Sequence, residues 1–249
     1  MPSSSYDDIA GIYHELWADW YLPAAKPALE KLFFSQVPPG STVLDVCCGS
    51  GHVTKELVTR GYKVTGIDSS AALIAQARAD LPDVDLRVQD ARAIQLESRY
   101  QAALSTFDSL NHVLSIEELR SVFRGVCRVL EPGGMFVFDM NLEHAYLSDH
   151  DWRQRWTVNI RDGSIGLVRG SYDVDEKKAR TEVIWFTRRE ADDLWEQRRS
   201  VVEQKCYPES EILIALNDAG FGEIEAVPAA DAGIRSRLGV GRIFFVARV

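Results

Sequence analysis

The most informative segment of this chain is VLDVCCGSG, at residues 43–51. Its first four residues have the character of a buried strand, which the glycines then break into a turn. The residues from Val53 to about Arg60 continue with helical character. Glycines in such a turn let the backbone approach a ligand closely, and the start of the next helix offers unpaired N–H groups. The stretch therefore predicts a strand–turn–helix unit that binds a small ligand.

A rhythm of short strands and longer helical segments continues through residues 42–139. Strands that alternate with helices need crossover connections, which predicts a parallel sheet with helices on both faces. Ser115 and Glu118 form a capping-box pattern at the start of one helix, and Ser69 or Ser70 is expected to cap another. The EPGG stretch at 131–134 is expected to end the helix before the next strand.

The rhythm changes after Asn141. Residues 157–161, 166–173, 180–188 and about 194–206 have strand character with no helix between them. This pattern predicts an antiparallel β insertion. Helical character returns at 208–221, and two strand-like runs follow it.

Composition excludes several classes of protein. The 249 residues contain 28 Lys+Arg and 37 Asp+Glu, and the net charge of −9 argues against a protein that wraps a polyanion. No apolar run approaches the roughly 18 residues of a membrane helix, and the first residues, MPSSSYDDIA, lack the features of a signal peptide. We therefore expect a cytoplasmic protein. The four cysteines show no metal-binding spacing, so we expect reduced thiols and no metal site.

An acid at the end of the second strand indicates the kind of ligand. Asp68 lies 17 residues after Gly51, near the spacing at which a carboxylate accepts hydrogen bonds from a ribose. Thr54 occupies the place of the third glycine of the dinucleotide fingerprint, which disfavours NAD. Asp45 precedes the turn, where a carboxylate would repel a pyrophosphate but suits a ligand with an amino group. These features predict an adenosine-type ligand.

These residues match a known family. VLDVCCGSG resembles motif I of the class I S-adenosylmethionine-dependent methyltransferases, and GID at 66–68 resembles their second motif. Gln89-Asp90-Ala91 resembles the acidic motif of the third strand, STFDSLNHV at 105–113 that of the fourth, and LEPGG at 130–134 the loop before the fifth. YDDIAGIYHELWADWY at 6–21 resembles the tyrosine-rich first helix of a small-molecule group that includes deoxyaminosugar N-methyltransferase-like proteins.

The resemblance implies an α/β architecture. It is a Rossmann-like, seven-stranded, mostly parallel sheet whose last strand is antiparallel, together with the β insertion. Residues 1–140 and 210–249 would form the cofactor-binding core, with residues 1–40 as a helical lid. Residues 141–209 would cover the active site. The cofactor would be S-adenosylmethionine, which leaves as S-adenosylhomocysteine, and the partner a small-molecule acceptor, with no membrane.

The resemblance also implies roles for single residues. Asp68 would bind the ribose hydroxyls, and Asp90 with the backbone of Ala91 the adenine edge. Gly49 and Gly51 would approach the methionine portion, next to Cys47, which replaces the first glycine of the motif. Asp45 would interact with the glycine turn or with the amino group of the cofactor, directly or through water. The expected cofactor-binding residues are Tyr13, Asp45, Cys47, Gly49, Gly51, Asp68, Ser69, Asp90, Ala91 and Phe107.

Two residues of the fourth-strand motif are candidates for catalysis. His112 is the best-placed general base because its intrinsic pKa is close to neutral, although a histidine that only lines the pocket fits the same pattern. Asn111 could orient an acceptor hydroxyl or amine. We expect methyl transfer to an N or O atom of a small molecule. A tRNA or other nucleic-acid methyltransferase, and a non-catalytic cofactor-binding regulator, remain alternatives, and the sequence leaves both the acceptor and the choice between monomer and homodimer open.

Overall fold

The computed structural model of the chain describes residues 6–13, 19–97, 99–148, 152–161, 163–189 and 191–249. The helices and helical turns are α1 (Ala10–Tyr13), α2 (Asp19–Leu29), η2 (Glu30–Phe34), α3 (His52–Thr59), α4 (Ala71–Asp80), η3 (Ala91–Ala93), η4 (Ser109–His112), α5 (Ile116–Val129), α6 (Glu143–Ser148), α7 (Glu209–Asp218) and η6 (Arg237–Gly239). The strands are β1 (Thr42–Val46), β2 (Lys63–Asp68), β3 (Asp85–Val88), β4 (Tyr100–Ser105), β5 (Leu130–Asn141), β6 (Arg153–Arg161), β7 (Ser164–Asp173), β8 (Lys178–Arg188), β9 (Trp195–Lys205), β10 (Glu223–Pro228) and β11 (Arg242–Arg248).

The core of the molecule is a seven-stranded sheet. Its strand order is β10-β11-β5-β4-β1-β2-β3, and β1 pairs in parallel with both β2 and β4. Strand β11 runs antiparallel to both of its neighbours, β5 and β10. The predicted Rossmann-like sheet with an antiparallel last strand is therefore confirmed. The order reverses between β1 and β4, and ligands of open α/β sheets bind at such a point, beyond the carboxyl ends of the strands.

Helices cover both faces of this sheet through separate apolar clusters. On one face, Phe123 of α5 and Ile212 of α7 pack against Phe138 of β5. On the other face, Phe33 of η2 and Leu57 of α3 belong to a second cluster with β1, β4 and β11. All five side chains are completely buried, so the two clusters hold the sheet rigidly beneath the ends of its strands.

The helix starts follow the sequence pattern. Ser70 caps α4 by accepting a hydrogen bond from the backbone N–H of Leu73, and Ser115 caps α5 by accepting one from Glu118. The end of α5 differs from the expectation. The helix ends at Val129, and EPGG belongs to β5, which begins at Leu130 where it pairs with Tyr100 before a shift in register.

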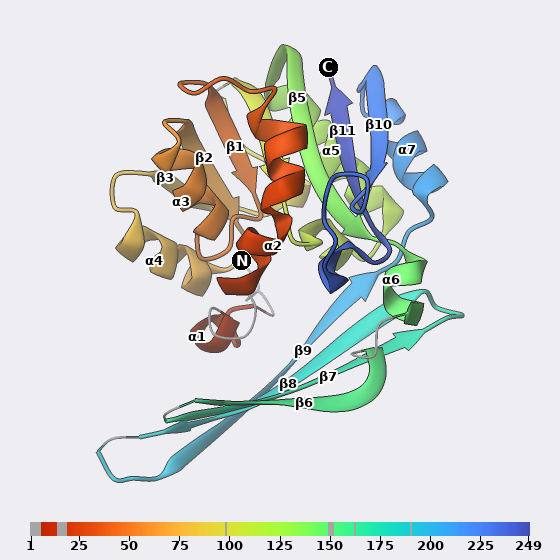
Figure 1. Cartoon of the computed structure of the whole chain (residues 1–249). Coiled ribbons are helices and arrows are strands. Elements are labelled where there is room, and N and C mark those ends of the chain that lie inside the picture. Colours follow the sequence, from red (N-terminus) through yellow and green to blue (C-terminus); the bar gives the residue numbers. More distant parts are fainter. Residues whose placement is uncertain (1–5, 14–18, 98, 149–151, 162, 190) are drawn as a thin grey trace.

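The insertion forms a separate four-stranded antiparallel sheet with the order β6-β7-β8-β9. Strands β6, β7 and β8 are longer than the sequence runs indicated, β9 is close to its expected run, and all four extend from one end of the core as a twisted ribbon (Figure 1). The helix α1 lies between this ribbon and the core (Figure 1). Ile9 and Ile12 pack there against Val183, Trp185 and Val202 of the insertion. The N-terminal segment thereby joins the insertion to the core.

Within the residues that the structure describes, no helix is long and apolar enough to cross a membrane.

Candidate functional site

A cavity of about 780 Å³ lies between the core sheet, the insertion sheet and the N-terminal segment. Residues just after β1, at the end of β2 and just after β4 line one side of it, and residues of β7, β8 and β9 line the other. Seven of the predicted site residues line this cavity: Tyr13, Cys47, Gly49, Asp68, Ser69, Phe107 and His112. Its size falls in the range of small-molecule and cofactor sites.

Asp68 is held in one orientation at the end of β2. Its Oδ2 accepts a hydrogen bond from the backbone N–H of Gly49 at 2.9 Å, and its Oδ1 accepts one from Ser70 at 2.8 Å. Burial raises the pKa of Asp68, while these two N–H groups lower it. The carboxylate keeps further acceptor capacity toward the cavity, and paired acceptors of this kind suit the two hydroxyls of a ribose. The geometry therefore fits the ribose end of the expected cofactor.

The glycine turn approaches the cavity through Gly49. This residue has φ +55°, and a Cβ built on it would lie 3.8 Å from the ring of Tyr13, so a larger side chain would fill the space beneath that ring. Cys47 also has a positive φ of +60°, a strained conformation for a residue with a Cβ. Gly51 does not line the cavity. A Cβ on it would lie 3.1 Å from Ala77, so Gly51 permits close packing against α4.

Asp45 lies below the turn rather than in the cavity. Its side chain is buried, and its Oδ2 accepts a hydrogen bond of 2.6 Å from the hydroxyl of Thr54. Burial raises the pKa of Asp45 to about 7. Because this carboxyl group anchors the first turn of α3, the geometry gives no support to direct contact with the amino group of a cofactor.

Asp90 and Ala91 also lie outside the cavity lining. Asp90 caps η3, and both of its carboxylate oxygens bind the guanidinium of Arg92. Ala91 is buried in the apolar cluster beneath α5. The carboxylate of Asp90 stays partly exposed beside this ion pair, and its contact with an adenine edge stays a prediction.

The N-terminal segment lines part of the cavity through Tyr6 and Tyr13. The ring of Tyr6 makes edge contacts with the rings of Tyr13 and His112, with centroids 5.7 and 5.2 Å apart. Asp7 fastens the segment to α4, since its Oδ1 accepts hydrogen bonds from the hydroxyl of Ser70 and the backbone N–H of Ala72. Tyr6 and Tyr13 of the predicted lid therefore line the cavity, whereas η2 of the same segment packs on the face of the core sheet. Residues 1–5 and 14–18 of that lid fall outside the described residues.

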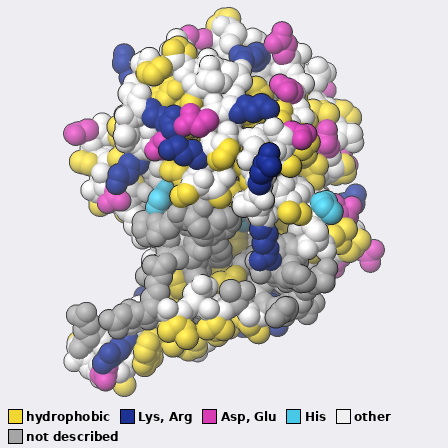
Figure 2. Space-filling model, viewed as in Figure 1, with side chains coloured by type: hydrophobic (Ala, Val, Ile, Leu, Met, Phe, Trp, Pro, Cys, Tyr) yellow, Lys and Arg dark blue, Asp and Glu magenta, His cyan; other side chains and the backbone are white. Residues whose placement is uncertain are grey.

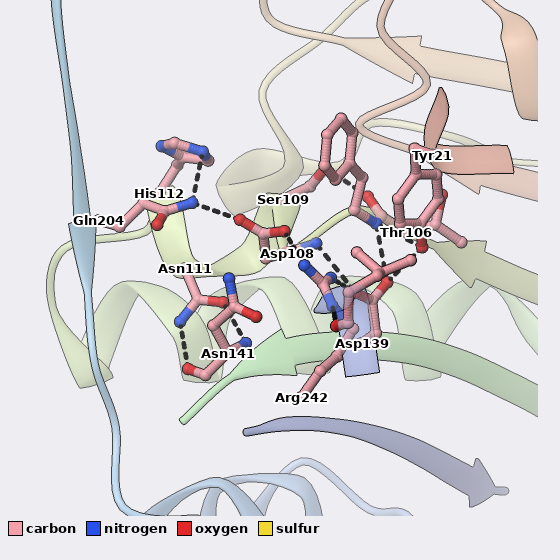
Figure 3. Close-up of polar contacts among 12 residues, drawn as sticks. Tyr21, Thr106, Asp108, Ser109, Asn111, His112, Asp139, Asn141, Gln204 and Arg242 are labelled. Atoms are coloured by element: carbon pink, nitrogen blue, oxygen red, sulfur yellow. Dashed lines mark hydrogen bonds and ion pairs between the residues drawn. The ribbon is translucent and has the colours of Figure 1, made fainter. Parts of the chain in front are cut away.

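A strained turn after β4 lines the cavity on the same side as the glycine turn after β1. Phe107 and Asp108 have φ of +65° and +46°, although neither is glycine. The carboxylate of Asp139 holds both residues by accepting their backbone N–H groups at 2.7 and 3.1 Å. It also binds Arg242, which donates a second bond of 2.6 Å to Asp108 (Figure 3). The hydroxyl of Tyr21 donates to the same carboxylate at 3.0 Å.

His112 faces the cavity from the turn η4. Its Nδ1 lies 2.8 Å from the backbone carbonyl of Glu203, and its Nε2 lies 2.8 Å from the hydroxyl of Tyr6. A carbonyl oxygen only accepts, so Nδ1 carries the proton and Nε2 offers its lone pair. Burial lowers the pKa of His112, which keeps the imidazole neutral. The site can therefore accept a proton at Nε2.

Asn111 has a different position from its neighbour. Its side-chain amide donates to the backbone carbonyls of Asn141 and Lys205 and accepts from the N–H of Asn141 (Figure 3). The side chain is completely buried and does not line the cavity. It joins the core to the insertion, and the expected contact with an acceptor finds no support in this geometry.

Several cavity residues were not predicted from the sequence, namely Asp108, Asn141, Gln204 and Arg242. Asp108 lies inside the STFDSLNHV motif, so its position next to Phe107 was an available signal. Gln204 and Arg242 follow Asp108 by 96 and 134 residues, and no local pattern indicates that they meet it.

Comparison with known proteins agrees with this geometry. Residues 43–134 match the family model described as a methyltransferase domain. The dTDP-3-amino-3,4,6-trideoxy-α-D-glucopyranose N,N-dimethyltransferase of Streptomyces venezuelae is 34% identical over 163 residues, which are 64% of this chain and 66% of the relative.

Two solved structures share the fold across the chain. The S-adenosylmethionine-dependent methyltransferase of Clostridium acetobutylicum has a TM-score of 0.78 at 19% identity, with 99% of each chain covered. DesVI of Streptomyces venezuelae has a TM-score of 0.76 at 24% identity, with 96% of this chain and 98% of DesVI covered. Residues 43–134 therefore form a methyltransferase domain, and with the sheet order and the turn that meets Asp68 the chain is an S-adenosylmethionine-dependent methyltransferase.

Proposed function

We propose that the enzyme methylates the amino nitrogen of a small molecule, with amino sugars as the first class to test, and that it acts in the cytoplasm. The observation that carries the proposal is the neutral His112, whose Nε2 faces the cavity as a hydrogen-bond acceptor. An amine must lose its proton to act as a nucleophile, and a buried neutral imidazole is suited to receive it. The relative from Streptomyces venezuelae, named as an amino-sugar N,N-dimethyltransferase, supports the choice of acceptor.

The cavity residues would have two roles in the proposed reaction, which are binding of the cofactor and transfer of a proton. When bound, S-adenosylmethionine supplies an electrophilic methyl group on a positively charged sulfur. Asp68, Ser69 and Gly49 would hold this cofactor beside the glycine turn, and Cys47 and Phe107 line the same space. His112 would take the proton of the acceptor at Nε2.

The N-terminal segment would exclude water from the reacting groups. Tyr6 and Tyr13 line the cavity and contact each other edge to face. Aromatic rings at this position favour a sulfonium by cation–π attraction of order 1 kcal/mol. Alignment of two reactants in a closed site supplies roughly 7–11 kcal/mol of barrier reduction, so positioning is the larger contribution of the protein.

A nucleic-acid acceptor fits the surface less well. Figure 2 shows both Lys and Arg and Asp and Glu side chains on one face of the molecule, and the whole chain has a net charge of −9. Binding of a polyanion is driven by clustered positive charge and weakens steeply with salt. A small-molecule acceptor also matches the volume of the cavity, about 780 Å³.

The acceptor can be tested with the full chain and S-adenosylmethionine. Release of S-adenosylhomocysteine would be measured with dTDP-linked amino sugars, free amino sugars, their hydroxyl analogues and tRNA, followed by mass spectrometry of the products. We expect methyl groups on the amines alone. Transfer to a hydroxyl analogue or to tRNA, or no transfer to any member of the panel, would contradict the proposal.

The role of His112 has its own control. His112→Gln is expected to lower kcat/KM at pH 7 by about 100-fold or more. The loss should shrink at high pH, where the amine loses its proton to water. A loss that stays constant with pH would show that His112 acts only through packing.

A further inference from the structure

Gln204 of the insertion strand β9 lies between two polar groups of the core. Its Nε2 is 2.5 Å from Oδ2 of Asp108 and 3.2 Å from Nε2 of His112 (Figure 3). Its Oε1 accepts a hydrogen bond of 3.1 Å from the hydroxyl of Tyr146. The side chain is buried, and its amide contacts a carboxylate, an imidazole and a phenol at once.

The chemistry of these neighbours fixes which end of the amide is which. The carboxylate of Asp108 only accepts, so the nitrogen of Gln204 must face it and the oxygen must face Tyr146. The second hydrogen of the same nitrogen then points at Nε2 of His112. This arrangement requires an unprotonated Nε2, because a protonated one would set an N–H against an N–H.

The backbone of the neighbouring residue acts on the other side of the ring. The carbonyl of Glu203 accepts from Nδ1 of His112 at 2.8 Å. Two consecutive residues of β9 thus define one neutral tautomer of His112. The insertion sheet therefore contributes to the proton-accepting group as well as to the wall of the cavity.

The charges around His112 explain why a neutral amide is needed there. Asp108 raises the pKa of His112, whereas burial of the ring lowers it. Arg242 occupies Oδ1 of Asp108 at 2.6 Å, and the amide of Gln204 occupies Oδ2. Besides Asp108, the titratable side chain of Tyr6 faces His112, and its hydroxyl contacts Nε2 at 2.8 Å. If Oδ2 of Asp108 were free to approach the ring of His112, its negative charge would favour the imidazolium form. An imidazolium cannot accept a further proton.

We propose that Gln204 is a positioning residue for the reaction, which separates His112 from Asp108 and keeps the Nε2 lone pair directed into the cavity. The inference rests on the proposed role of His112 as a base. In the acceptor complex, the hydrogen of the acceptor nitrogen would replace the hydroxyl of Tyr6 at this lone pair. The contact of 3.2 Å between Gln204 and Nε2 would open when Nε2 takes the proton, while Gln204 keeps its hydrogen bonds to Asp108 and Tyr146.

The test is a measurement of the ring nitrogens of His112 in the full chain. Protein labelled with ¹⁵N at its five histidines would be followed by long-range ¹H–¹⁵N NMR from pH 5 to 9, and His112→Gln would assign the signal. In the unmodified protein we expect a proton on Nδ1 and none on Nε2 at neutral pH. In Gln204→Glu the new carboxylate should raise the pKa of His112 by about one unit or more.

Two further variants complete the design. Gln197→Glu places the same charge at an exposed position of β9 and should leave the His112 titration unchanged. Gln204→Met keeps an unbranched side chain but has no hydrogen-bond donor, so it frees Oδ2 of Asp108 without adding a new charge. It should therefore raise the pKa of His112 by less than Gln204→Glu does. It also carries the test if Gln204→Glu does not fold. A titration of His112 that is the same in the unmodified protein and in each folded Gln204 variant would overturn the inference.

The outcome is independent of the acceptor. The NMR titration needs no substrate, so a shift in Gln204→Glu supports the positioning role even if the amine panel fails. If an amine is methylated, the acid limb of the pH–rate profile should move upward in Gln204→Met. An unmoved limb together with an unmoved NMR titration would assign Gln204 a purely structural role.

Discussion

The carboxylate of Asp139 accepts a hydrogen bond from the backbone N–H of Phe107, with an N–O distance of 2.7 Å. Phe107 and the next residue, Asp108, both adopt left-handed backbone conformations at the wall of the cavity. Such conformations cost of order 1–3 kcal/mol each and persist only where surrounding structure fixes them. Asp139 supplies that constraint from the buried strand β5, and Arg242 balances its charge.

Asp139→Asn should therefore unfold far more easily than the unmodified protein. The variant leaves Arg242 with one acidic partner and turns an amide toward groups that donate. Loss of one member of a buried ion pair costs about 3–5 kcal/mol, and we expect a decrease of this size in urea titrations. Asp231→Asn at an exposed position should change the free energy of unfolding by less than about 0.5 kcal/mol. Equal effects of the two variants would show that Asp139 does not anchor the turn.

Cys47 provides a test of backbone strain in the glycine turn. Cys47→Gly and Cys47→Ala both remove the sulfur, but only glycine relieves the strain at φ +60°. We expect the glycine variant to be more stable than the alanine variant by about 1 kcal/mol. The same pair at Cys127, inside α5, should show the opposite order by about 1 kcal/mol, because glycine disfavours helices. Thermal or urea unfolding of the four variants measures both differences, and an alanine preference at both positions would contradict the strain.

Asp45 should make stability depend on pH. Its pKa is about 7 in the folded protein, where burial raises it, and about 3.9 in the unfolded chain. Between these values the folded state retains a proton that the unfolded state has released. Stability from this group is therefore complete below about pH 4 and is lost as the pH rises to about 7.

Asp45→Asn removes this titration and keeps an acceptor for Thr54. As the pH rises from 4 to 8, the free energy of unfolding of the variant should increase relative to that of the unmodified protein by up to roughly 4 kcal/mol. Urea titrations across this range measure the difference. The exposed Asp83→Asn should show a small difference that does not vary with pH. A flat difference for Asp45→Asn would mean that its carboxyl group ionises normally in the fold.

Asp68 and Asp90 should differ in their effect on cofactor binding. Hydrogen bonds to a charged group contribute about 1.5–3 kcal/mol, so Asp68→Asn should weaken S-adenosylhomocysteine binding by about 10- to 100-fold. Asp90 is paired with Arg92 outside the cavity lining, and Asp90→Asn should weaken binding by less than about threefold. Isothermal titration calorimetry compares them. Equal losses would show that Asp90 contributes to cofactor binding as Asp68 does, in agreement with the contact to the adenine that the family resemblance implies.

Local sequence signals predicted the parts of the fold that depend on neighbouring residues. The glycine turn after β1, the acid that ends β2 and the serine caps of α4 and α5 each follow from residues a few positions apart. The alternation of strands and helices then leaves few topologies open, because parallel strands need crossover connections. Resemblance to a family extended this to the antiparallel last strand, which the structure confirms.

The composition of the site was decided by tertiary structure. Three residues have sequence positions that suggest a ligand contact: Asp45, Gly51 and Asn111. In the folded chain Asp45 accepts from Thr54, Gly51 packs against α4, and Asn111 binds backbone groups. Gln204 and Arg242 enter the site from distant strands, where only the packing of the insertion and β11 places them beside Asp108. The periodicity of apolar residues indicates which face of a helix or strand is buried. A hydrogen bond between residues far apart in the sequence depends instead on how the elements that carry them pack together.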